Sequence, residues 1–135
     1  MIFVDTGPLL ARCIQRDQHH EAAIEGWRRL REHRVVTTNH VLDEFFTLLG
    51  RRAGYAFAAE RARQILTSEV LEIERPELED ELTAIEAFDR FSDQGVSFTD
   101  ALSFAVMRRL RVERAFSFDH HFVLAGFEFW PAHAP

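Results

Sequence analysis

The sequence predicts an α/β fold in which helices cover both faces of a central, mostly parallel sheet, in a single domain spanning residues 1–135. Short apolar runs alternate along the chain with longer segments whose apolar residues recur at helical spacing, as in parallel sheets with crossover helices. The length is close to the commonest size of one domain. The hydrophobic fraction of 47% and the 13 phenylalanines are sufficient for a full core.

The first half of the chain is expected to contain three strands, each preceded or followed by a helix. The apolar run 1–5 fits a buried strand, and Pro8 marks the start of a helix behind it, because proline is favoured in the first helical turn. Asn39 is the expected N-cap of a later helix. Further helices are predicted over 20–31, 40–49 and 55–66, and strands over 34–38 and 70–73.

The second half is expected to contain two long helices of different character. The segment 77–91 is amphipathic, its acidic first turn suits a helix N-terminus, and its carboxylates are predicted to be solvated. The apolar residues of 99–110 fall nearly all round the helix, which predicts a central, buried position. Strands are predicted over 115–118 and 127–130, with a short helical turn over 119–122.

Composition bounds the kind of protein before any site is considered. Cys13 is the only cysteine, so no intramolecular disulfide forms, and a reducing compartment is expected. No secretion signal or membrane-spanning stretch is present in the sequence, so we predict a cytoplasmic protein. The net charge of −6 disfavours nucleic-acid binding by itself. All 16 basic residues are arginine, however, and the candidates for guiding RNA are Arg51, Arg52, Arg108 and Arg109.

Four acidic side chains are placed where they can converge on one site. Asp5 and Asp119 follow apolar runs, at the carboxyl ends of predicted strands, where parallel sheets hold their ligands. Asp100 begins the buried helix, and Glu44 lies nearer than Asp43 to the apolar arc of its helix. Each has an ordinary alternative as a helix cap or an exposed acid. Together they predict a cation site, and oxygen ligands favour Mg²⁺ or Mn²⁺ and phosphoryl chemistry.

The triplet Asp5-Thr6-Gly7 also has a second interpretation, as the Asp-Thr-Gly of an aspartic protease that completes its pair of aspartates by dimerisation. Proteases of that class keep the following segment extended. Here the segment after Gly7 has helical spacing, and several long helices follow, so the protease is the weaker alternative. A third alternative is a binding module without catalytic activity.

The four acidic segments in order, MIFVDT, VLDEFFTLL, GVSFTDAL and FSFDHHF, resemble the four acidic motifs of a PIN domain of the VapC toxin type, over the whole chain. The resemblance implies a PIN-like α/β/α sandwich and a metal-dependent endoribonuclease. It assigns the catalytic quartet to Asp5, Glu44, Asp100 and Asp119, with Asp5, Asp100 and Asp119 as ligands of Mg²⁺ or Mn²⁺. It also implies an RNA substrate, a homodimer, and a cognate antitoxin of the VapB type that blocks the site.

The histidines and one serine near the last motif have no assigned role from the sequence. His120 and His121 follow Asp119, and DHH is also found in manganese phosphoesterases, but those chains are much longer and carry further Asp/His motifs. His120 and His121 are therefore expected at a helix start, with one ring near the site. Ser117 stands where the resembling family often has threonine, which keeps a hydroxyl two residues before Asp119.

Overall fold

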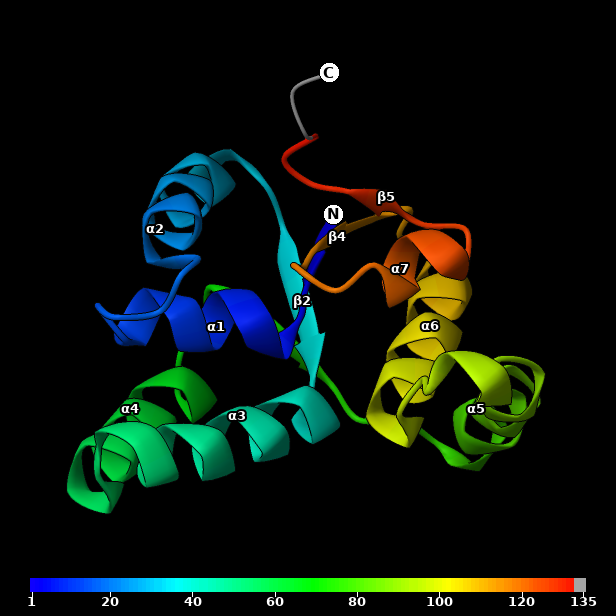
Figure 1. Cartoon of the computed structure of the whole chain (residues 1–135), viewed down its shortest axis with the longest axis horizontal. Helices are drawn as coiled ribbons and strands as arrows, with labels where there is room; N and C mark the ends of the chain where they lie inside the picture. The colour runs from blue at the N-terminus through cyan, green and yellow to red at the C-terminus, as the bar shows by residue number, and fades with distance from the viewer. Residues whose placement is uncertain (133–135) are drawn as a thin grey trace.

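A five-stranded, all-parallel sheet forms the centre of the computed structural model, which describes residues 1–132 (Figure 1). The strand order is β3-β2-β1-β4-β5. The predicted α/β architecture with a mainly parallel sheet is confirmed. The strands are β1 (Ile2–Val4), β2 (Val35–Thr38), β3 (Leu71–Glu74), β4 (Arg114–Phe116) and β5 (Glu128–Phe129).

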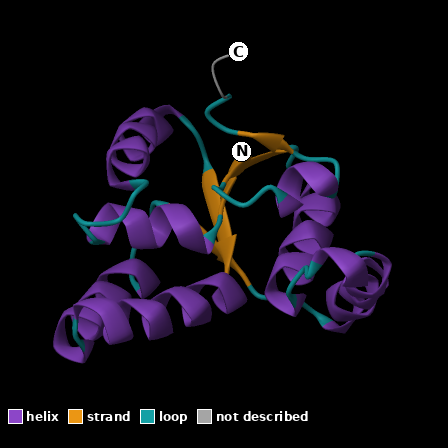
Figure 2. Ribbon diagram, viewed as in Figure 1, coloured by secondary structure: helices purple, strands orange, loops and turns teal. Residues whose placement is uncertain are grey.

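Helices cover the sheet on both faces, which gives three layers (Figures 1 and 2). One layer contains α1 (Thr6–Cys13), α2 (His20–Arg29), α3 (Asn39–Ala53) and α4 (Tyr55–Leu66). The other contains α5 (Leu78–Arg90), α6 (Phe98–Leu110) and α7 (His121–Leu124). Short 3₁₀ turns, η1 (Leu30–Glu32) and η2 (Ser92–Gln94), follow α2 and α5. No helix in the described part of the chain has both the length and the apolarity needed to cross a membrane.

The core is built around the central strand β1 and the helix α6. All three residues of β1 are completely buried, as a strand covered on both faces requires. In α6, every residue from 100 to 107 is buried. Its apolar side chains therefore meet neighbours on all sides, as predicted from their distribution around the helix. The ring of Phe104 on α6 contacts the rings of Phe122 on α7 and of Phe127, which precedes β5.

Several element boundaries differ from the sequence prediction by one to four residues, and two of these differences have a clear physical cause. Thr38, not Asn39, is the N-cap of α3: its backbone is extended, and its hydroxyl accepts a 3.1 Å hydrogen bond from the N–H of Val41. Strand β4 ends at Phe116, because its partner β1 ends at Val4. The N–H of Asp5 donates a 3.0 Å hydrogen bond to the carbonyl of Phe116, which is the last backbone hydrogen bond between the two segments. Asp119 therefore lies in the loop after β4 and not directly at the strand end.

Charged residues on α5 and α6 have partners within the protein that local sequence patterns do not reveal, and one expectation is corrected. Asp80 was expected to be solvated, but it is buried, and its carboxylate accepts hydrogen bonds from Arg109 Nε at 2.9 Å and from the N–H of Glu77 at 3.1 Å. Arg109 also pairs with Glu74. Arg108 donates to the carbonyl of Ala125 and lies over the ring of Phe127. Both arginines thus have partners within the protein, and their role in guiding RNA stays a prediction.

The order of the strands fixes where a ligand can enter. From β1 the chain builds outward through β2 to β3, and then returns to the other side of β1 to form β4 and β5. The crossovers on the two sides of β1 therefore run in opposite directions, which leaves a crevice beyond the carboxyl ends of β1 and β4. Asp5 follows β1, and Asp119 lies in the loop after β4.

Candidate active site

A pocket of about 560 Å³ opens at this switch point between β1 and β4. The four acids predicted from the sequence all contribute to its lining. Apolar side chains of three separate segments form part of its wall, namely Leu10, Leu48 and Phe118. The lining residues thus come from α1, α3, the start of α6 and the loop between β4 and α7.

Asp5 is the most buried of the four acids, with 6% of its surface exposed. It is the residue between β1 and α1, so the strand pairing of β1 with β4 holds its backbone in place. Ser117 Oγ donates a 2.8 Å hydrogen bond to its Oδ2. Burial is the main reason that the pKa of Asp5 is raised to about 7, and the charge of Asp100 adds to the shift.

Asp100 lies in the first turn of α6 and is 9% exposed. The helix is capped by Ser97, whose hydroxyl accepts a 3.0 Å hydrogen bond from the N–H of Asp100. Since the cap is made by Ser97, the carboxylate of Asp100 is left to face the pocket. Burial raises the pKa of Asp100 to about 6, with a further increase from the charge of Asp119.

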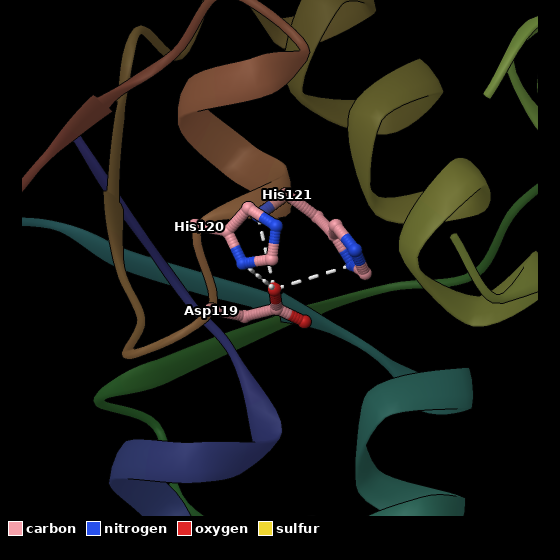
Figure 3. Close-up of side chains that lie close together, drawn as sticks. All are labelled: Asp119, His120 and His121. Atoms are coloured by element: carbon pink, nitrogen blue, oxygen red, sulfur yellow. Dashed lines mark hydrogen bonds and ion pairs between the residues drawn. The ribbon is translucent and has the colours of Figure 1, made fainter. Parts of the chain in front are cut away.

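Asp119, in the loop after β4, and His121, the first residue of α7, line the same side of the pocket, and Figure 3 shows their side chains close together. The N–H of Asp119 donates to Ser117 Oγ at 3.0 Å, so the same serine contacts both Asp5 and Asp119. Asp119 Oδ1 accepts a 2.9 Å hydrogen bond from the N–H of His121. The ring of His121 places Nδ1 at 3.2 Å from Asp119 Oδ1 and 3.4 Å from Asp100 Oδ2, so it contacts carboxylates of two different elements.

Glu44 reaches the pocket from the opposite side, on α3. It is exposed, whereas its neighbours on the apolar arc of α3, such as Leu42 and Phe45, are buried. Its charge contributes to the raised pKa of Asp100. Glu44 lines the pocket while Asp43 does not, as the angle on the helical wheel suggested.

The donor set suits a divalent cation. Four carboxylates share the pocket, and none of the described residues that line it is an arginine or a lysine. Without a cation, burial and the repulsion between the carboxylates raise the pKa of both Asp5 and Asp100 above its ordinary value. Carboxylate oxygens are the ligands that Mg²⁺ and Mn²⁺ prefer. The residues present therefore fit such an ion, and Asp5, Asp100 and Asp119 are the groups that would hold it.

The aspartic protease alternative does not fit this geometry. Thr6 and Gly7 are the first two residues of α1, and the sheet in the described chain is parallel throughout. Gly7 is also packed closely under Phe118: a Cβ on it would lie 3.3 Å from the ring. The triplet therefore marks the passage from a central strand into a helix, and Asp5 is placed by that passage.

Sequence patterns assigned no role to Ser117, to His121 or to the backbone carbonyl of Gln94. In the structure, the carbonyl oxygen of Gln94 lies 3.0 Å from His121 Nε2. A hydroxyl two residues before Asp119 was the only local signal for Ser117. No local signal existed for the contact between His121 and Asp100, because these residues are 21 positions apart and on different elements.

Comparison with known proteins gives a consistent result. The profile of the PIN domain matches residues 2–128. The chain is 41% identical over 127 residues to the 23S rRNA-specific endonuclease VapC20 of Mycobacterium tuberculosis, covering 94% of this chain and 95% of that protein. It is 33% identical to a VapC ribonuclease of Archaeoglobus fulgidus, covering 94% and 83%. The crystal structure of M. tuberculosis VapC20, described as a Sarcin-Ricin loop cleaving toxin, superimposes with a TM-score of 0.87 at 39% identity, covering 94% and 96%.

Proposed function

The chain belongs to the PIN domain family, and on that basis we propose that it is the endoribonuclease toxin of a type II toxin–antitoxin module and that its reaction depends on Mg²⁺ or Mn²⁺. The observation that carries the proposal is the convergence of Asp5, Glu44, Asp100 and Asp119 on one pocket. A binding module without activity would have no use for four carboxylates that repel one another. The relatives named above are nucleases, and the chain matches 95% and 83% of their length, which supports the same function.

The side chains divide the work as follows. Asp5, Asp100 and Asp119 would hold the cation, and Glu44 lines the same pocket from α3. Ser117 fixes the orientation of Asp5 through its hydroxyl and that of Asp119 through the backbone N–H. When bound, the ion supplies Lewis acidity that acidifies water and offsets negative charge on the phosphate. Attack of water in line with the 3′ oxygen breaks the P–O3′ bond, so the products carry a 5′-phosphate and a 3′-hydroxyl.

The substrate class is structured RNA. VapC20, the relative with 41% identity, is named for 23S rRNA and its structure for the Sarcin-Ricin loop. We therefore propose that loop as the first substrate to test. Exposed arginines at the end of α3, Arg51 and Arg52, remain the candidates for contacting RNA phosphates, whereas Arg108 and Arg109 are engaged within the protein.

The protein is proposed to act with two partners. A VapB-type antitoxin would cover the acidic pocket, whose charge favours a basic side chain and whose walls at Leu10, Leu48 and Phe118 favour apolar ones. A homodimer is supported by an exposed apolar stripe along one side of α5. Its members recur at helical spacing and are 45–68% exposed, which is unusual for a stripe of large apolar residues on an isolated chain: Leu78, Leu82, Ile85 and Phe88.

The decisive experiment is cleavage of a Sarcin-Ricin loop hairpin by protein purified without antitoxin. Activity should disappear in EDTA and return with Mn²⁺, and the new ends should be 5′-phosphate and 3′-hydroxyl. Asp5→Asn should be inactive under the same conditions. Asp89→Asn, which changes an exposed acid on α5, is the matched control and should cleave like wild type.

Two outcomes would count against the proposal. Equal cleavage by wild type and Asp5→Asn would show that the activity comes from elsewhere. Products ending in a 2′,3′-cyclic phosphate would indicate a metal-independent ribonuclease, because that product arises from attack by the 2′-hydroxyl and not by water. Cleavage of other RNAs, but not of the hairpin, would keep the ribonuclease and reject only the substrate.

A further inference from the structure

We propose that His121 is a ligand of the metal through Nδ1, and that this nitrogen makes the site prefer Mn²⁺, or another transition ion, to Mg²⁺. The inference rests on the proposed metal-dependent function and extends it. It concerns a residue that lies outside the acidic quartet. Figure 3 shows the ring of His121 turned toward the carboxylate of Asp119.

The contacts of the His121 ring indicate which of its nitrogens carries hydrogen. His121 Nε2 lies 3.0 Å from the carbonyl oxygen of Gln94. A carbonyl oxygen accepts hydrogen bonds and cannot donate them, so Nε2 must be the donor in this contact. In the neutral ring, which is the form that binds metals, the backbone of η2 therefore selects the tautomer that leaves the Nδ1 lone pair available for a cation.

The other ring nitrogen of His121, Nδ1, faces two carboxylates. It lies 3.2 Å from Asp119 Oδ1 and 3.4 Å from Asp100 Oδ2. A nitrogen lone pair directed at two carboxylates is repelled by both unless a positive centre lies among the three atoms. Asp100 and Asp119 are the same groups that would hold the metal, so the cation they share is also within reach of Nδ1.

The surroundings of the His121 ring agree with the way in which histidine binds metals in proteins. A metal-bound imidazole commonly donates its other N–H to a carboxylate or a backbone carbonyl, which fixes the ring and raises the basicity of the ligating nitrogen. His121 has this arrangement, with Gln94 as the carbonyl partner. Its side chain is only 14% exposed, so the ring is held in place.

The neighbouring His120 provides the contrast. Ligand atoms of Asp119, His120 and His121 all lie within 4.8 Å of one another, so distance alone does not separate the two histidines. The side chain of His120 is 76% exposed, however, and its Nδ1 lies 3.8 Å from Asp119 Oδ1. The ring of His120 packs against that of His121, with centroids 4.5 Å apart. The ring of His121 also contacts the carbonyl of Gln94 and the carboxylate of Asp100. The geometry therefore assigns the ligand role to His121.

The chemical consequence is a change in metal preference. Mg²⁺ is a hard cation that favours oxygen ligands, whereas imidazole suits transition ions better. Replacing one of the oxygen ligands of an all-carboxylate site by nitrogen thus favours Mn²⁺ over Mg²⁺. The preference is a property of the metal-binding equilibrium and does not require turnover to be seen.

The test uses the full-length protein, stripped of metal and loaded with Mn²⁺ alone. Pulsed electron paramagnetic resonance should show coupling of the Mn²⁺ electron spin to ¹⁴N, and labelling the wild type with ¹⁵N-histidine should convert the coupling to that of ¹⁵N. His121→Gln should abolish the coupling while its amide keeps a donor for the Gln94 carbonyl. By titration calorimetry, its affinity for Mn²⁺ should fall about tenfold or more, and its affinity for Mg²⁺ should fall less. His120→Gln is the control and should behave like wild type.

The outcomes separate this inference from the function on which it rests. If Mn²⁺ binds wild type but shows no nitrogen coupling, His121 is not a ligand, and the ribonuclease proposal stands. If the coupling survives in His121→Gln and disappears in His120→Gln, the ligand is the other histidine. If wild type binds no Mn²⁺, or Asp119→Asn binds it equally well, the metal centre itself is wrong. If His121→Gln fails to fold, ¹⁵N-histidine-labelled His120→Gln decides the point: ¹⁵N coupling that persists in this variant supports His121 as the ligand, and its loss rejects His121.

Discussion

Ser117 Oγ joins Asp5 to the opposite end of the chain: it donates a 2.8 Å hydrogen bond to Asp5 Oδ2 across a separation of 112 residues. The same oxygen accepts a hydrogen bond from the N–H of Asp119 at 3.0 Å. One buried hydroxyl thus connects the residue after β1 with the loop after β4. It sets the relative position of two acids that sequence patterns could only place separately.

The first prediction follows from this contact. Ser117→Ala leaves Asp5 Oδ2 and the Asp119 N–H without their partner, so the free energy of unfolding should fall by about 1–2 kcal/mol. The value of kcat/KM for RNA cleavage should fall about tenfold, the equivalent of about 1.4 kcal/mol. Denaturant titration and steady-state kinetics measure the two effects. Ser117→Thr keeps the hydroxyl and is the matched control. An Ala variant with wild-type kcat/KM would show that Ser117 orients nothing that matters to the reaction.

The second prediction concerns the free energy of unfolding without metal. The pKa of Asp100 is raised from 3.8 to about 6, so the folded protein binds this proton more tightly than the unfolded chain. The resulting penalty is absent below pH 3.8, grows up to about pH 6, and is complete at pH 7. Asp100→Asn removes it. In EDTA at pH 7 this variant should melt a few degrees above wild type, which corresponds to a gain in the free energy of unfolding on the order of 1 kcal/mol.

The controls for this prediction use pH and metal. The advantage of Asp100→Asn should disappear near pH 4, where the carboxyl group of wild type is protonated. The variant should also lose the stabilisation that wild type gains from millimolar Mn²⁺. Asp89→Asn, on the exposed side of α5, should change none of these values. A lower melting temperature of Asp100→Asn in EDTA at pH 7 would mean that Asp100 is needed for folding and that its charge is not a cost.

The third prediction has the opposite sign and concerns Asp80. Its hydrogen bond with Arg109 is the largest cause of its lowered pKa. A lowered pKa in the folded state contributes stability above the ordinary value of 3.8, and this contribution is lost as the pH falls through the folded pKa. Asp80→Asn should therefore reduce the free energy of unfolding at pH 7 by about 1 kcal/mol. In a background of Arg109→Gln, the same substitution should cost less. Equal costs in both backgrounds would exclude the ion pair as the cause.

The fourth prediction tests the apolar stripe on α5. Leu82 and Ile85 are 56% and 50% exposed and lie one turn apart on the same side of the helix. If the stripe is the homodimer interface, Leu82→Glu and Ile85→Glu should convert a dimer to a monomer in sedimentation velocity, because buried unpaired carboxylates are costly. Val70→Glu changes an apolar residue that is 80% exposed elsewhere and should remain a dimer. A wild-type monomer at micromolar concentration, or a dimer that survives both charged variants, would reject the interface.

Most of the secondary structure could be predicted from local patterns, because those patterns reflect forces between neighbours in the chain. The continuous apolar run of β1 and the apolar residues all round α6 report burial directly. Boundaries were less certain where a tertiary contact decides them. Thr38 caps α3 in place of Asn39, and β4 stops at Phe116 because β1 offers no further partner.

Charged residues were the least predictable, because a charge looks the same in sequence whether it is solvated or paired. Asp80 accepts a local hydrogen bond from the N–H of Glu77 in the first turn of α5, but its ion pair depends on Arg109, 29 residues later. Arg108 and Arg109 resemble a free basic cluster until α7 and α5 are placed beside them. The long-range partners exist only after the layers have packed.

The sequence alone determined which four acids belong together, since Asp5, Glu44, Asp100 and Asp119 each stand in a recognisable local setting in a fixed order. Only the tertiary structure decided how they meet. The pairing of β1 with β4 brings Asp5 to the carbonyl of Phe116 and places Asp119 beside it through Ser117. The packing of α7 near α6 and η2 turns His121 toward Asp100 and Gln94. Apart from the local hydrogen bond between Ser117 and Asp119, these contacts span 21 to 112 residues. Local propensity carries no information about them, because their energy comes from groups that become neighbours only in the folded protein.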